Sequence, residues 1–155
     1  MRVHIGSDHA GLSTKQFLVS ALAERGHEVI DHGPHEYDAL DDYPPFCLAT
    51  GAGVVADPGS LGVVLGGSGN GEQIAANKVD GVRAALVWSA EIARLARQHN
   101  DANVISIGAR MHSQDDVIAF VEAFIATPFS GDERHVRRIG QLATYERTGE
   151  VPPTR

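Results

Sequence analysis

Apolar residues occur along this chain in two kinds of pattern. Short runs rich in valine, isoleucine and leucine predict buried strands at 2–7, 28–31, 61–65, 82–87 and 103–107. Longer segments predict helices at 12–24, 44–56, 92–99, 113–126 and 132–147, and a further helix starts over 73–78. Strands that alternate with helices favour an α/β fold with a five-stranded parallel sheet and helices on both of its faces.

The segments between these elements indicate how the chain is organised. Pro44 and Pro45 suit the first turn of a helix, and Ser113 suits an N-cap. The residues from 32 to 42 are mostly polar and predict a loop. The chain has no internal repeat and no low-complexity linker, so we expect a single domain at 1–148 followed by a short tail at 149–155.

Composition and charge narrow the class of protein. The 155 residues are 43% hydrophobic and 21% charged, which is usual for a globular protein. The net charge of −7 gives no overall basic field, so we expect neither nucleic acid nor a membrane as a partner. The first residues lack the pattern of a signal peptide, and Cys47 has no second cysteine to pair with. We therefore expect a cytoplasmic protein.

Polar side chains follow three of the predicted strands. Asp8 and His9 come after the first strand, a glycine-rich loop comes after the third, and Arg110 comes after the fifth. In parallel α/β folds, ligands bind beyond the carboxyl ends of the strands. A carboxylate, an imidazole, a glycine loop and a guanidinium therefore meet at the edge where a ligand is expected.

The glycine loop is the strongest single signal in the sequence. It reads Gly-Gly-Ser-Gly-Asn-Gly-Glu from Gly66 to Glu72. Glycines let a backbone turn tightly and expose N–H groups to an anion. The loop lacks the Gly-Lys-Ser/Thr ending of a P-loop, and Glu72 stands where a dinucleotide-binding loop needs glycine. A plain turn from strand to helix, with Glu72 as a favourable charge in the first helical turn, is the alternative interpretation.

Glu72 gives the loop a specific chemistry. A loop that only binds anions gains nothing from a carboxylate, whereas a loop that stabilises an oxyanion beside a general base needs one. The helix dipole lowers the pKa of Glu72, so burial or substrate binding has to raise it again if the group is to act as a strong base.

Other polar residues fit either a functional or a structural interpretation. Arg134 and Arg138 lie on one face of the last predicted helix, where they form either a phosphate clamp or a solvated surface. His9 and His99 gain functional weight only if both reach one pocket, because a histidine also caps a helix end. On the other side of the last helix, Val136 and its neighbours Ile139 and Ala143 are expected to pack.

No metal and no organic cofactor are expected. His32 and His35 lie near acidic residues in the polar loop, but without a recognisable ligand spacing. Cys47 has apolar neighbours within a predicted helix, so we interpret it as a packed thiol and not as a nucleophile.

Taken in order, these motifs resemble the family of type B ribose-5-phosphate isomerases, which also contains the galactose-6-phosphate isomerase subunits. The resemblance extends over nearly the whole chain, from about Val3 to Tyr145. Its markers are Gly6 to Gly11, Asp42-Tyr43-Pro44, Gly66 to Lys78, Arg97 to Asp101, and Ile107 to Arg110. It implies a Rossmann-like three-layer sandwich, a homodimer, and metal-free interconversion of an aldose phosphate and its ketose.

The resemblance also implies a role for individual residues. Asp8 and His99 would assist ring opening, and Ser68 would move protons between the two substrate oxygens. The other implied roles are substrate and phosphate binding, with the arginines of the last helix reaching in from the second subunit. The residues concerned are His9, Tyr43, Gly67, Gly69, Asn70, Gly71, Asn100, Arg110, Arg134 and Arg138.

One position departs from the family pattern. Many members carry a cysteine as the base at the end of the third strand, where this chain has Gly66. The sequence resembles the actinobacterial branch, in which a glutamate in the following turn is the base, and Glu72 stands at that place. Two alternatives stay open, because fold alone does not determine function. One is isomerisation of a tetrose or hexose phosphate, and the other is non-catalytic binding of a phosphosugar or nucleotide.

Overall fold

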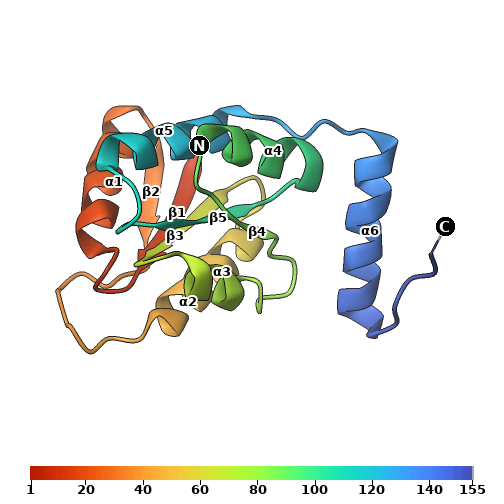
Figure 1. The fold of residues 1–155 in the computed structure, drawn as a ribbon, viewed down its shortest axis with the longest axis horizontal. Helices are drawn as coiled ribbons and strands as arrows, with labels where there is room; N and C mark the ends of the chain where they lie inside the picture. Colours follow the sequence, from red (N-terminus) through yellow and green to blue (C-terminus); the bar gives the residue numbers. More distant parts are fainter. Residues whose placement is uncertain (155) are drawn as a thin grey trace.

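Five parallel strands form the central sheet of the computed structural model, which describes residues 1–154 (Figure 1). The strand order is β2-β1-β3-β5-β4, with adjacent strands parallel throughout. The predicted parallel sheet is therefore confirmed. The strands are β1 (Arg2–Ser7), β2 (Glu28–Asp31), β3 (Leu61–Gly66), β4 (Ala84–Leu86) and β5 (Val104–Gly108).

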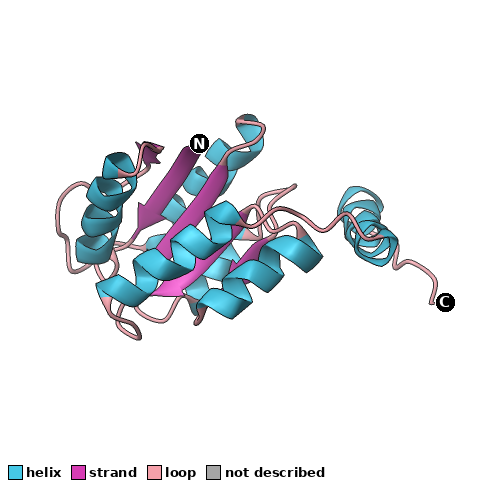
Figure 2. Ribbon diagram, turned by 90° about the horizontal axis from the view of Figure 1, so that it is seen from above, coloured by secondary structure: helices cyan, strands magenta, loops and turns pink. Residues whose placement is uncertain are grey.

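Helices cover both faces of this sheet and give the predicted three-layer sandwich (Figure 2). Helices α1, α4 and α5 pack on one face, where Ile5, Leu65 and Ile107 are fully buried. Helices α2 and α3 pack on the other face, against Val64 and Val104. The helices are α1 (Leu12–Glu24), α2 (Tyr43–Ala56), α3 (Asn70–Ala76), α4 (Ala90–Asn100), α5 (Gln114–Ala126) and α6 (Glu133–Thr148).

Most bounds agree with the prediction to within one residue, but α3, β4 and α4 differ by two residues or more. Helix α3 begins at Asn70 and not at Gln73, because Gly69 adopts a left-handed φ of 83° that turns the chain directly from the strand into the helix. Strand β4 is shorter than the predicted 82–87, since the N–H of Val82 donates to Val79 in a turn and not to the sheet. Glu72 consequently lies in the first turn of a helix, as the plain-turn interpretation also expected.

Helix α6 stands apart from the sandwich, joined to α5 by an extended segment (Figures 1 and 2). His135 is its only buried residue. The expected packing of Val136 and Ala143 is wrong within this chain: both are exposed, as are Leu142 and Tyr145. An amphipathic pattern predicts a helix with an apolar side, but it does not identify the surface that covers that side.

Residues 1–154 contain no helix that is both long enough and apolar enough to cross a membrane.

Candidate active site

The loop after β3 is held closely against β5. The hydroxyl of Ser106 donates a hydrogen bond to the carbonyl of Gly69 at 2.6 Å. A β-carbon on Gly108 would approach the Ser68 carbonyl oxygen to 2.7 Å, so glycine is needed there for the two backbones to meet. Ser68 itself is exposed, and its hydroxyl accepts a hydrogen bond from the backbone N–H of Asn70 at 3.3 Å. The loop is thus a fixed structure with an exposed hydroxyl.

The side chain of Glu72 turns back toward the end of β3. Its carboxylate lies so close to Gly66 that a β-carbon on that residue would overlap it. Glu72 is only 4% exposed, which is unusual for a carboxylate. The missing side chain at position 66 and the buried carboxylate are therefore two parts of one arrangement.

This environment changes the pKa of Glu72. Burial raises it above the usual value for a glutamate, because the charged form loses its contact with water. The nearby Asp8 carboxylate raises it further, whereas hydrogen bonding from the backbone of Glu72 and Gly69 lowers it. The net shift is upward, in the direction that a general base near neutral pH requires.

Tyr43 and Arg110 lie beside the same loop. The ring of Tyr43, at the start of α2, packs so closely that a β-carbon on Gly71 would be 2.7 Å from its Cζ. The exposed Arg110 follows β5, and its N–H donates to the carbonyl of Gly67 at 3.2 Å. The structure thus brings both residues to the glycine loop, which the sequence predicted for Arg110.

Asp8 and His9 complete this group from the end of β1. Asp8 is 8% exposed, and its Oδ1 accepts a hydrogen bond from the N–H of Gly11 at 3.1 Å. The Nδ1 of His9 lies 2.6 Å from the Oδ1 of Asp41, in the loop between β2 and α2. Sequence reasoning missed Asp41, because nothing in a polar loop marks which carboxylate folds back onto a strand end.

A second group of predicted residues lies elsewhere. A cavity of about 210 Å³ lies between α4 and α6. It is lined by His99 and Asn100 from α4, and by Arg138 and the buried His135 from α6. The rings of His99 and His135 are 4.5 Å apart, and burial together with the nearby His99 lowers the pKa of His135. Arg134 is exposed on the same helix as Arg138. His135 is a further residue of this group that sequence reasoning did not single out.

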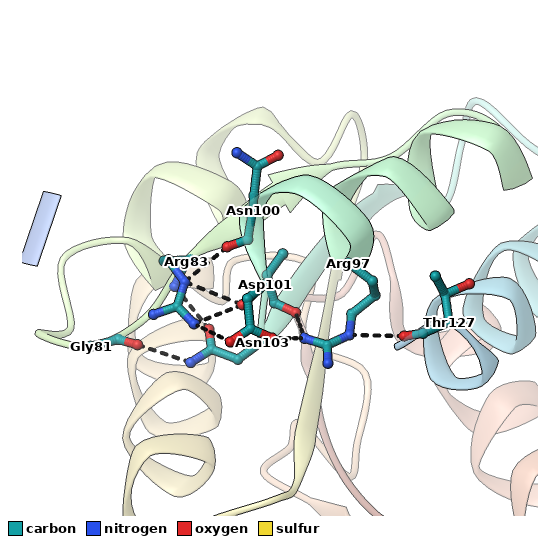
Figure 3. Close-up of polar contacts among 8 residues, drawn as sticks. Gly81, Arg83, Arg97, Asn100, Asp101, Asn103 and Thr127 are labelled. Atoms are coloured by element: carbon teal, nitrogen blue, oxygen red, sulfur yellow. Dashed lines mark hydrogen bonds and ion pairs between the residues drawn. The ribbon is translucent and has the colours of Figure 1, made fainter. Parts of the chain in front are cut away.

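A polar network fixes the end of α4 at Asn100, the residue after His99 (Figure 3). Asp101 has a left-handed φ of 44° there, and its carboxylate accepts from Arg97 at 2.8 Å. The guanidinium of Arg83 donates to the carbonyls of Asn100 at 3.0 Å and of Asp101 at 2.7 Å. Since Arg83 directly precedes β4, this network lies at the amino ends of the strands.

The two groups are therefore at opposite edges of the sheet. Glu72, Asp8 and Arg110 follow the carboxyl ends of strands, whereas His99 precedes β5. A strand of five residues, such as β5, separates its ends by roughly 15 Å. Within one chain, His9 and His99 consequently do not share a pocket, and Asp8 does not meet His99.

One group of residues within 1–154 has the spacing of a metal site. It consists of Asp8, His9 and Asp41, whose ligand atoms lie within 4.8 Å of one another. Hydrogen bonds already engage two of these ligand atoms: Asp8 Oδ1 accepts from the Gly11 N–H, and His9 Nδ1 contacts Asp41 Oδ1. The loop histidines considered above are apart: His32 contacts His4 at 2.8 Å, and His35 lies 3.7 Å from Asp31.

Cys47 is a packed thiol, as predicted. It is fully buried between the sheet and α2. Burial, with the carboxylates of Glu72 and Asp8, raises its pKa to about 12. A thiol with so high a pKa is not a nucleophile at neutral pH.

Fold and site together define an α/β protein with a buried carboxylate in a glycine loop, an arrangement suited to proton transfer beside a bound anion. The chain belongs to the ribose/galactose isomerase family, whose model matches residues 3–142.

Named relatives cover almost the whole chain. It is 60% identical over 153 residues to ribose-5-phosphate isomerase B of Mycobacterium tuberculosis strain H37Rv, covering 99% of this chain and 94% of the relative. The Escherichia coli K12 enzyme of the same name is 34% identical, with 94% and 96% covered.

Solved structures agree with this relationship. Ribose-5-phosphate isomerase B of Mycoplasma genitalium with bound ribulose-5-phosphate has a TM-score of 0.91 and 39% identity, covering 95% of this chain and 97% of that one. The Clostridium thermocellum protein of the same name has a TM-score of 0.92 and 38% identity, with 97% and 100% covered. The Rossmann-like sandwich expected from the sequence is thus confirmed.

Proposed function

We propose that this chain interconverts ribose 5-phosphate and ribulose 5-phosphate. The observation that carries the proposal is the buried carboxylate of Glu72 inside the glycine loop of a ribose/galactose isomerase family member. The relative with ribulose-5-phosphate bound supports the choice of sugar phosphate. The lone cysteine suits the cytoplasm, where such an enzyme would serve the pentose phosphate pathway.

Glu72 acts as the base in this proposal. In the open-chain aldose, the carboxylate takes the proton from C2 while negative charge moves onto O1, and it returns the proton to C1 to complete the ketose. Backbone amides between Gly67 and Gly71 stabilise the enediolate, and Ser68 moves a proton between O1 and O2. Tyr43 contacts the sugar, and Asn70 is one of the substrate-binding residues of the loop. No step calls for a metal or an organic cofactor.

Two subunits share each active site in this proposal. One chain supplies Asp8 and the glycine loop, and the second supplies His99 for ring opening and Asn100 for contact with the sugar. The separation of these groups across the sheet supports this arrangement, since a single chain does not bring them together. In the dimer, each of two equivalent sites would receive the same residues.

The phosphate would be held from both subunits. His9 and Arg110 come from the chain that carries the glycine loop, and Arg134 and Arg138 come from α6 of the second chain. Guanidinium groups match phosphate oxygens, and both α6 arginines are exposed. The uncovered apolar side of α6, with Leu142 61% exposed, gives that helix a surface to bury in such a dimer.

A hexose phosphate is the second candidate substrate, because the family description also names galactose. The test is a rate panel over ribose, allose, galactose and erythrose phosphates in deuterated water. We expect the highest kcat/KM with ribose 5-phosphate and deuterium at the exchanged carbon of the recovered sugar. Faster turnover of a hexose phosphate would identify that sugar as the substrate instead. Binding without turnover or exchange would show that the chain is a non-catalytic binder.

A further inference from the structure

Asp41 holds His9 through two hydrogen bonds to a single oxygen. Its Oδ1 accepts from the backbone N–H of His9 at 3.0 Å and faces the ring Nδ1 at 2.6 Å. The side chain of Asp41 is only 10% exposed, and that of His9 is 23% exposed. A charge-assisted contact that is this short and this well shielded from solvent is stronger than an ordinary hydrogen bond. Asp41 thereby fixes both the backbone and the ring of the residue that follows Asp8.

The loop that carries Asp41 is anchored at its other end as well. Lys15, which is 1% exposed, donates to both carboxylate oxygens of Asp31 at 2.6 Å. Asp31 also accepts from the N–H of Gly33 at 2.8 Å, at the start of the loop. Tyr37, within the loop, meets the His9 ring edge-on with centroids 6.1 Å apart. The loop is thus tied at both ends and lies against His9.

We propose that Asp41 is a positioning residue that holds the imidazole of His9 ready for the substrate phosphate; this rests on the proposed function, in which His9 binds phosphate. With Nδ1–H donating to Asp41, the opposite nitrogen, Nε2, is left for the ligand. Nε2 donates to a phosphate oxygen while Nδ1 donates to Asp41 only when the ring is an imidazolium. The Asp41 carboxylate stabilises that cation.

The second carboxylate oxygen of Asp41 makes its contact with His9 more important. Its Oδ2 is buried and has no hydrogen-bond partner within residues 1–154. A buried carboxylate that lacks a second donor depends on its one cationic or N–H partner, which here is His9. Asp8 and Tyr37 also lie close to the ring, and neither is a cation. Asp41 has the position of the counter-ion of His9.

The kinetic test compares Asp41→Asn, His9→Gln and the double variant in the full-length protein. We expect Asp41→Asn to raise KM for ribose 5-phosphate about tenfold with kcat almost unchanged, as loss of one charged hydrogen bond predicts. In the His9→Gln background, Asp41→Asn should have no further effect on KM. Glu36→Gln is the matched control, because Glu36 is an exposed carboxylate of the same loop. Equal effects of Asp41→Asn in both backgrounds would overturn the proposal.

A second readout does not depend on activity. Long-range ¹H–¹⁵N correlation spectra of the ligand-free protein report which nitrogen of His9 carries hydrogen. We expect a protonated Nδ1 in the wild type and a changed His9 pattern in Asp41→Asn only; an unchanged pattern would overturn the pairing. Lack of wild-type turnover of ribose 5-phosphate would instead remove the proposed function, while the spectra would still decide whether Asp41 holds His9.

Discussion

The carboxylate of Glu72 occupies the space into which a side chain on residue 66 would project. A β-carbon on Gly66 would overlap Oε1 and lie 2.7 Å from Oε2. Position 66 is also where the family resemblance implies a cysteine base in many members. A side chain at 66 and a glutamate folded inward from 72 therefore exclude one another. The inward position of the Glu72 carboxylate therefore requires a glycine at the end of β3.

Gly66→Ala should consequently displace Glu72. The added methyl group has no free volume, and overpacking of this kind costs about 1–3 kcal/mol of folding free energy. We expect lower stability in urea unfolding together with a large loss of kcat. Gly140→Ala is the control, since a β-carbon there meets nothing within 4 Å.

Adding Glu72→Ala to the Gly66→Ala variant should restore much of the lost stability, because it removes the group that the methyl strikes. A double variant no more stable than Gly66→Ala alone would show that the overlap is relieved elsewhere.

The raised pKa of Glu72 has a consequence for stability. Since the folded-state pKa lies above the unfolded one, the folded state favours the protonated form. The associated stability is present below the unfolded pKa and is lost as the pH rises through the folded pKa. Glu72→Gln carries no charge at any pH. Its stability relative to the wild type should therefore increase as the pH rises through the usual glutamate range and on through the raised folded-state pKa.

Urea unfolding of both proteins across this range measures the difference. Glu24→Gln, an exposed glutamate at the end of α1, should show no such trend. A difference that stays constant with pH, or that has the opposite sign, would mean that burial does not raise the pKa of Glu72.

A shared active site predicts complementation between defective chains. Arg138→Ala should raise KM at least about tenfold, because a charged hydrogen bond to phosphate is lost. Glu72→Gln should lose turnover. In a mixed dimer of the two variants, one of the two sites regains both residues, so random mixing should restore about a quarter of wild-type activity. No gain over the unmixed variants, in dimers shown to have exchanged, would contradict the shared site.

Local patterns predicted most of the fold, because each element has its own signal. Four of the five strands lie within one residue of their predicted bounds. The predicted N-cap at Ser113 accepts from the Asp116 N–H at 3.1 Å. Long-range contacts lacked such a signal: Asp41 reaches His9 across 32 residues. The exposed Val136 on α6 shows the same limit, since no pattern within a helix names the surface that will cover it.

The separation of Asp8 from His99 could have been predicted from the connectivity alone. Helix α4 follows β4 and precedes β5, so its carboxyl end meets the amino edge of a parallel sheet. The roles of both residues came from the family resemblance, which does not state which subunit supplies each. Their places at opposite edges of the sheet support the proposal that two subunits share each site.

The central claim is that Glu72 removes the proton from the sugar. Its most direct test is the turnover of ribose 5-phosphate by Glu72→Gln, with substrate binding measured separately by calorimetry. We predict binding close to that of the wild type and a fall in kcat of at least about a hundredfold, as expected for loss of a general base. Deuterium incorporation from solvent should fall equally. A variant that binds the sugar and retains near-normal kcat would contradict the claim.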